Sequence, residues 1–181
     1  MNIQITPYKL NKSTIEKYHI IRLDNTQIIY RICNVFAPFG RQTEHFTKNK
    51  LSQHRLNISF SNEQIANNDK AYLELIRIIN ELESFFGTFD ELKDYKLVSN
   101  IINRDTFGII IRFHLKTQYN KTTTPLVHLK DSDEENVEWI QFDKTKQFNM
   151  DITPDCLWID NKNKNYGISF VINKVVQFFI N

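Results

Sequence analysis

The sequence predicts a mainly β fold, built as a small Greek-key β-barrel with one packed α-helix at about residues 70–86. Several short runs of β-branched and aromatic residues have the lengths and the flanking turn residues of strands. One segment shows clear helical periodicity. The chain has 181 residues, 41% of them hydrophobic, but only four glycines and four prolines. It is therefore expected to form a single domain, residues 1–181, without long flexible linkers.

The first strands are expected in the N-terminal third of the chain. Residues 20–23 and 28–36 are apolar and β-branched, and Asp24-Asn25 is the expected turn between them. The second strand ends at the break Pro38-Phe39-Gly40, after which a basic loop is expected. A strictly alternating strand follows at residues 55–60, with Leu56, Ile58 and Phe60 on one face and Arg55, Asn57 and Ser59 on the other.

One helix is expected at residues 70–86, with Asp69 as its N-cap and Gly87 ending it in a left-handed turn. A short second helix is expected at residues 11–18. The apolar positions of the longer helix recur at steps of three and four residues and form one stripe that can lie on a sheet: Tyr72, Leu75, Ile76, Ile79, Leu82 and Phe86.

The second half of the chain is expected to complete the barrel. Strands are predicted at residues 107–115 and 138–142, and a pair at residues 156–159 and 166–179 flanks a polar turn. The acidic run at residues 131–135 is expected to be a solvated loop tip. Several short strands with one inserted helix are typical of an OB-like barrel.

Motifs of catalysis and cofactor binding are not found in the sequence. It contains no glycine-rich phosphate loop, no Cys or His pair with zinc spacing and no nucleophile elbow. Asp133, Glu134 and Glu135 offer magnesium ligands, but they are adjacent on one loop, whereas a nuclease draws its carboxylates from separate strands. We therefore expect no enzyme, no metal and no cofactor, and a nuclease using the acidic run is the alternative.

The expected compartment is the cytoplasm. The N-terminus has no basic segment followed by an apolar run, and no stretch reaches the ~18 apolar residues of a membrane span. Cys33 and Cys156 lie in apolar, strand-like contexts, which predicts two reduced core thiols rather than a disulfide.

Basic and aromatic residues gather in two blocks. The first, residues 41–55, contains one acid, Glu44, and the second, residues 112–130, contains none. Because the net charge is only +2, attraction to nucleic acid must come from such local patches. The candidate nucleic-acid-binding residues in and around the blocks are Arg31, Phe39, Arg41, His45, Phe46, Lys48, Lys50, His54, Arg55, Arg112, His114, Lys116, Tyr119, Lys121, Trp158 and Tyr166.

Cations interleaved with aromatic rings suit a flat, anionic, unpaired polymer better than a small substrate. Arg112, His114 and Lys116 share one face of the predicted strand 107–115 and can follow a line of phosphates. Exposed rings such as Phe39 or Tyr119 can stack on bases at ~1–3 kcal/mol each. The competing interpretation is that every alternating strand has a solvated face, on which such charges are common.

Two short motifs resemble single-stranded DNA-binding proteins of large cytoplasmic DNA viruses. In that family a strand ends in a PFG turn and a strand of the form LxLSF follows, similar to residues 38–40 and 56–60 here. The C-terminal part, with Leu157-Trp158-Ile159 and a later strand beginning Tyr166-Gly167, is similar to the end of those proteins. The Asn-, Ile- and Lys-rich composition also fits AT-rich yeast cytoplasmic linear plasmids, which carry replication genes similar to those of such viruses.

The resemblance, which covers about residues 28–60 and 155–178, implies an OB-fold protein that coats single-stranded DNA during replication without catalysis. Its implied partners are single-stranded DNA and replication proteins such as a DNA polymerase. Phage proteins of similar fold recruit the polymerase through an acidic tail, but this chain ends in VQFFIN. Two alternatives stay open: a protein–protein adaptor in a viral-type replication or transcription complex, and a binder of single-stranded RNA.

Overall fold

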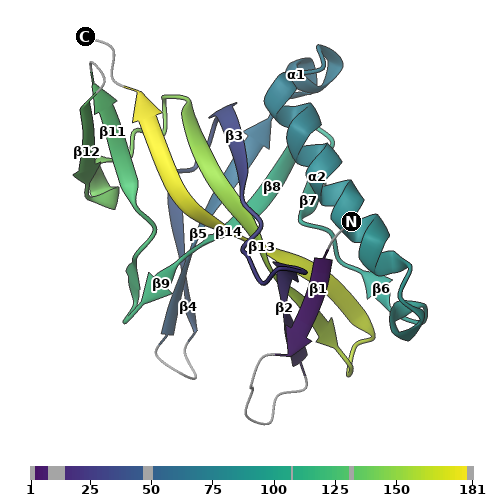
Figure 1. Cartoon of the computed structure of the whole chain (residues 1–181). Helices are drawn as coiled ribbons and strands as arrows, with labels where there is room; N and C mark the ends of the chain where they lie inside the picture. Colours follow the sequence, from purple (N-terminus) through teal and green to yellow (C-terminus); the bar gives the residue numbers. More distant parts are fainter. Residues whose placement is uncertain (1–2, 8–14, 47–50, 107, 131–132, 179–181) are drawn as a thin grey trace.

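The structure, a computed structural model, describes the chain except residues 1–2, 8–14, 47–50, 107, 131–132 and 179–181. Most described strands belong to one twelve-stranded sheet, whose main path runs β1-β2-β13-β14-β8-β5-β4. The sheet is not closed into a barrel. The mainly β class is thus confirmed, whereas the OB-like barrel is not. Figure 1 shows helix α2 along one side of the sheet and β11–β12 toward the other.

A long hairpin, β13 (Phe148–Asp160) with β14 (Asn165–Phe178), is the spine of the sheet. One edge of β13 pairs with β3 (Tyr30–Val35) and then with β2 (Ile15–Arg22). The free edge of β14 has three partners in succession. These are β6 (Lys96–Leu97), β8 (Gly108–Leu115) and β11 (Leu126–Lys130).

The remaining strands extend the sheet from these partners. β1 (Ile3–Pro7) pairs with β2, β5 (Leu51–Phe60) and β7 (Ile101–Arg104) pair with β8, and β4 (Arg41–Phe46) pairs with β5. β12 (Asp133–Val137) pairs with β11. β9 (Thr117–Gln118) and β10 (Lys121–Thr122) form a separate small hairpin.

The predicted helix is confirmed as α2 (Lys70–Gly87), which follows the short helix α1 (Asn62–Ala66). As expected, Asp69 caps α2: its Oδ1 accepts hydrogen bonds from the amides of Ala71 and Tyr72 at 2.9 and 3.0 Å. The predicted left-handed end at Gly87 is wrong, because Gly87 is itself helical and Thr88 follows in a right-handed conformation.

The sheet has two faces that strand alternation keeps distinct. The core face carries Leu56, Phe113 and Phe170, which pack with α2 in one buried cluster. The opposite face, called the outer face below, carries their sequence neighbours, including Arg55, Arg112 and Ser169. The interiors of the predicted strands therefore supply both the core and the polar surface that carries candidates such as Arg55 and Arg112.

Several local predictions are corrected by the structure. Residues 15–18 belong to β2 rather than to a helix, and residues 11–14 lie outside the described part. The basic loop is replaced by a hairpin, since β4 and β5 cover most of it. The strand predicted at 138–142 is a 3₁₀ turn, η2 (Trp139–Gln141), and the described part of the acidic run begins β12.

Other predictions hold in part. Gly40 has φ +60° and its amide donates to Ala37 O at 2.9 Å, so the expected Pro38–Gly40 turn is present. Cys156 is buried, but Cys33 is exposed and is not a core thiol; both are free. No helix within the described ranges is long and apolar enough to cross a membrane.

Candidate nucleic-acid interface

The two basic blocks, far apart in the sequence, meet directly on neighbouring strands. β5 and β8 pair in antiparallel register, with Arg55 opposite His114 and Asn57 opposite Arg112. Directly opposed residues of an antiparallel pair lie on the same face, here the outer face. Arg55 and Arg112 are therefore brought to one surface.

This surface is hollowed along the sheet. A hollow of about 170 Å³ is lined by both arginines, Trp158 and Glu44, among others. A second hollow, of about 400 Å³, is lined by Lys17, Lys116, Gln53 and Asp155, among others. His114 and Ser169 line both hollows, so the two adjoin. We call the pair the outer groove.

The smaller hollow lies where two strands separate. β14 pairs with β8 through Val171 and Ile172, and beyond this point the two strands take other partners, β6 and β7. Residues 98–100 bridge the gap: Val98 N donates to Tyr166 O at 2.8 Å, the Asn100 side chain donates to Ile168 O, and Arg112 N donates to Asn100 O at 3.3 Å. Two backbone hydrogen bonds and one from the Asn100 side chain thus fix the wall of the hollow.

The two arginines of the groove differ in their partners. Arg55 forms an ion pair with Glu44, and its Nε donates to Gln42 Oε1 at 3.3 Å. Arg112 makes no ion pair or side-chain hydrogen bond with any residue that the structure describes, and its Nε is buried. A half-buried guanidinium without a counter-charge is unfavourable, which favours an external anion there.

His114 contributes a neutral polar group rather than a charge. Burial lowers the pKa of His114, and the neighbouring Arg112 lowers it further. The Gln53 amide nitrogen lies 2.7 Å from His114 Nδ1. Because an amide N–H can only donate, Nδ1 accepts and the ring proton is on Nε2.

Trp158 provides an aromatic surface at the smaller hollow. A Cβ placed on Gly167 would lie 2.6 Å from the Trp158 ring and 2.7 Å from Val98 O. Gly167 thus lets the indole lie directly on the β14 backbone. The ring is half-buried and stands outside the main core cluster, so it combines packing with exposure to the groove.

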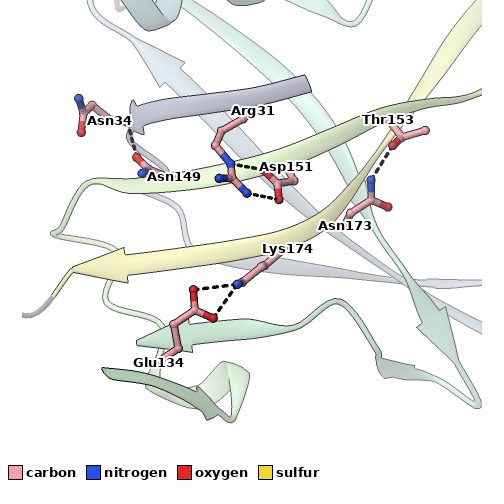
Figure 2. A network of polar contacts seen from close by, with 8 residues as sticks. All are labelled: Arg31, Asn34, Glu134, Asn149, Asp151, Thr153, Asn173 and Lys174. Atoms are coloured by element: carbon pink, nitrogen blue, oxygen red, sulfur yellow. Dashed lines mark hydrogen bonds and ion pairs between the residues drawn. The ribbon is translucent and has the colours of Figure 1, made fainter. Parts of the chain in front are cut away.

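Arg31 lies on β3, away from the outer groove, where charges are balanced (Figure 2). Its Nε and Nη2 donate to the two Asp151 carboxylate oxygens at 2.7 and 3.0 Å. On β14, Lys174 contacts the Glu134 carboxylate at 2.9 and 3.1 Å. Arg31 is therefore a weaker candidate for phosphate binding than the sequence suggested.

Three further candidates line a third hollow, of about 580 Å³, which we call the hairpin hollow. Arg41 and Lys121 line it and are exposed, and His54 lines it but is 5% exposed. His54 is held by Thr43 Oγ1 at 2.9 Å and Asn120 O at 3.0 Å, so it positions other groups instead of being free to contact a ligand.

The other candidates lie outside these hollows. Phe39 is 54% exposed at its turn and Tyr119 is 89% exposed on the β9–β10 hairpin. The prediction that Tyr166 binds nucleic acid is wrong. Tyr166 is 5% exposed and belongs to the core cluster, so its ring is not available to a base. The backbones of His45 and Phe46 belong to β4, but their side chains lie outside the description, as do Lys48 and Lys50 entirely.

Sequence reasoning missed several groove residues. Lys17 falls in the short helix predicted at residues 11–18, but it lies on β2 opposite Trp158. Gln42, Gln53 and Asn57 are not among the predicted site residues, yet they form hydrogen bonds to the charged and polar groups of the groove and to each other. The i, i+2 spacing of Gln53, Arg55 and Asn57 would have placed these three together once the strand was extended to residue 51.

Comparisons with known proteins do not identify the family. No protein-family model matches the sequence, and no curated protein matches it.

Within the described ranges, no group of three or more His, Cys, Asp or Glu residues is placed to hold a metal ion.

Proposed function

We propose that this protein binds single-stranded nucleic acid, DNA in the first place, along the outer groove and without catalysis. The observation that carries the proposal is the meeting of the two basic blocks on paired strands. There Arg112 has no partner for its Nε among the described residues, and it lines the same hollow as the Trp158 ring. A phosphate at Arg112 and a base against Trp158 would satisfy both groups. Lys17 and Lys116 extend the positive surface along the groove.

Little sequence preference is expected because the side chains of Gln42 and Gln53, which could read base edges, make hydrogen bonds to neighbouring groove residues. Gln42 Oε1 accepts from Arg55 Nε and from Asn57 Nδ2, the latter at 2.8 Å. Gln53 donates to His114. Cations and a ring face remain, and these recognise any nucleotide.

The role in replication, a polymerase partner, a cytoplasmic location and a relationship to OB-fold proteins are parts of the same proposal. They are supported by the resemblance of two segments to viral single-stranded DNA-binding proteins. The PFG turn does end a strand-and-turn unit here, between β3 and β4, and the LNISF segment does lie in β5. On this proposal, the open sheet of the protein would be an enlarged form of the OB-fold barrel.

Binding of labelled oligo-dT across a salt series tests the proposal. The logarithm of the affinity should fall with log salt by about 0.7 per phosphate contacted. Arg112→Gln should reduce that slope by about 0.7, and Glu44→Gln should increase affinity because it frees Arg55. Arg77→Gln on the exposed side of α2 is the matched control and should leave binding unchanged. Absence of binding at 50 mM salt, or a slope near zero, would overturn the proposal.

A protein–protein adaptor is the second candidate, and the charge-balanced row around Arg31 and Lys174 favours it. β4 also ends the described sheet and offers its free edge to an added strand. Recovery of a stable protein partner together with no affinity for oligo-dT would support this function over the first. Competition between oligo-dT and oligo-rU would separate a DNA binder from an RNA binder.

A further inference from the structure

The candidate cations lie on both faces of the sheet, a consequence of strand alternation. Arg41 is opposite Leu56, and Thr43 is opposite His54, so these residues lie on the core-face side of β4–β5. Gln42, opposite Arg55, lies on the outer face. The hairpin hollow with Arg41 and the outer groove with Arg55 are therefore on opposite sides of the same two strands.

The β9–β10 hairpin is fixed beside β5 by its turn. Asn120 Oδ1 accepts from the Ser52 amide at 2.8 Å, and Asn120 O accepts from His54 Nε2 at 3.0 Å. Thr43 Oγ1 contacts the other ring nitrogen of His54 at 2.9 Å. The hairpin thus holds a set position, with Lys121 directly after the turn and facing the hairpin hollow with Arg41.

Tyr119 occupies an unusual backbone conformation in this turn. Both turn residues have positive φ, +49° for Tyr119 and +63° for Asn120, as in a type I′ turn. Such positions favour Gly, Asn or Asp, and a bulky aromatic residue there is uncommon. Its ring is 89% exposed, so packing within the described part does not account for it. A strained and exposed aromatic residue points to a contact with a ligand.

We propose that the hairpin hollow is a second contact site for the same single strand, which passes around the edge strand β4 from the outer groove. Arg41 and Lys121 contact phosphates there, and Tyr119 stacks on a base. Neither cation has an ion pair with a described residue, and Thr122 Oγ1 in the hollow is buried without a partner among them. The path around β4 is on the order of 20 Å, given ~5 Å between strands and ~10 Å for a sheet layer.

The inference rests on the proposed function and predicts two-part binding that depends on length. An oligo-dT of about 4 nucleotides should fill the outer groove alone, and one of about 16 should reach both sites. Arg41→Gln combined with Lys121→Gln should leave binding of the short oligonucleotide unchanged. The same double variant should reduce the salt slope for the long one by about 1.4, which corresponds to two contacts. Tyr119→Ala should weaken binding of the long oligonucleotide alone.

The control is the double variant Arg77→Gln, Lys93→Gln, which removes two exposed positive charges from residues that line neither site. It should bind both oligonucleotides like the wild type. If the Arg41, Lys121 variant loses affinity for both lengths equally, or for neither, the second site is refuted while the proposed function stands. If the wild-type protein binds neither length, both proposals fail.

Discussion

Gly167→Ala tests the wall of the outer groove without reference to any ligand. The new Cβ would lie 2.6 Å from the Trp158 ring and 2.7 Å from Val98 O, and contacts below 3.0 Å require something to move. The carbonyl cannot yield easily because Val98 N is hydrogen-bonded to Tyr166 O at 2.8 Å. Overpacking of this kind costs about 1–3 kcal/mol. At about 2–4 °C per kcal/mol for a chain of this size, the melting temperature should fall by roughly 2–12 °C.

Thermal unfolding and tryptophan emission measure the two consequences together. The emission of Trp158 should shift to longer wavelength as its ring moves toward water, whereas Trp139, buried and hydrogen-bonded to Thr124 O at 2.7 Å, should give a constant background. Gly87→Ala is the matched control. A Cβ at this helical position meets Tyr166 Oη at an ordinary 3.6 Å, so the change should stabilise by about 0.5–1 kcal/mol.

The reasoning would be refuted by a Gly167→Ala protein with wild-type melting temperature and emission. A second measurement separates the two clashes. In a Trp158→Ala background the ring clash is removed and the Val98 carbonyl clash stays, so Gly167→Ala should cost clearly less than in the wild type. Equal costs in the two backgrounds would show that the ring does not lie against Gly167.

Two further changes test α2. Burial raises the pKa of Glu83, with hydrogen bonds from Ser99 and the Asn100 amide acting in the opposite direction. The protonated form therefore stabilises the fold at low pH, and this contribution is lost as pH rises through the raised pKa. Glu83→Gln should raise the free energy of unfolding at pH 7 and have little effect near pH 4, as measured by urea titration at both pH values. Asp69→Ala removes both capping bonds and should lower the free energy of unfolding by about 1 kcal/mol at either pH; no change would contradict the cap.

The sequence predicted elements whose apolar residues have a clear period. Helix α2 and the interiors of β5, β8 and β14 place large side chains in the core, and their patterns show it. β4 and β12 have the sequences RQTEHF and DEENV, and their strand state comes from pairing with β5 and β11. Polar edge strands of this kind carry little local signal, because the partner and not the apolar pattern selects them. At residues 138–142 the apolar pattern predicts a strand, but the structure has a 3₁₀ turn there. The Trp139 ring stacks on Phe142 in this turn.

The sequence predicts many of the residue types of the candidate site, but not which face of the sheet each residue lies on. The meeting of the two blocks follows from the β5–β8 pairing, a long-range contact that no local pattern specifies. Once β4 is known to be a strand, alternation alone separates Arg41 from Arg55. Pairing with carboxylates, as for Arg31 with Asp151, depends on register across 120 residues and could not be foreseen.

These pairings set how strongly binding should depend on salt. In the outer groove, Lys17, Arg112 and Lys116 have no ion pair with a described residue, whereas Arg55 is paired with Glu44. Three phosphate contacts give a slope of about −2.1, and displacement of Glu44 by a fourth phosphate gives about −2.8. Engagement of Arg41 and Lys121 as well would bring the slope to about −3.5 without that displacement. The slopes for a short and a long oligonucleotide therefore count the cations in use, and a slope clearly steeper than about −0.7 per unpaired cation would mean that internal ion pairs open on binding.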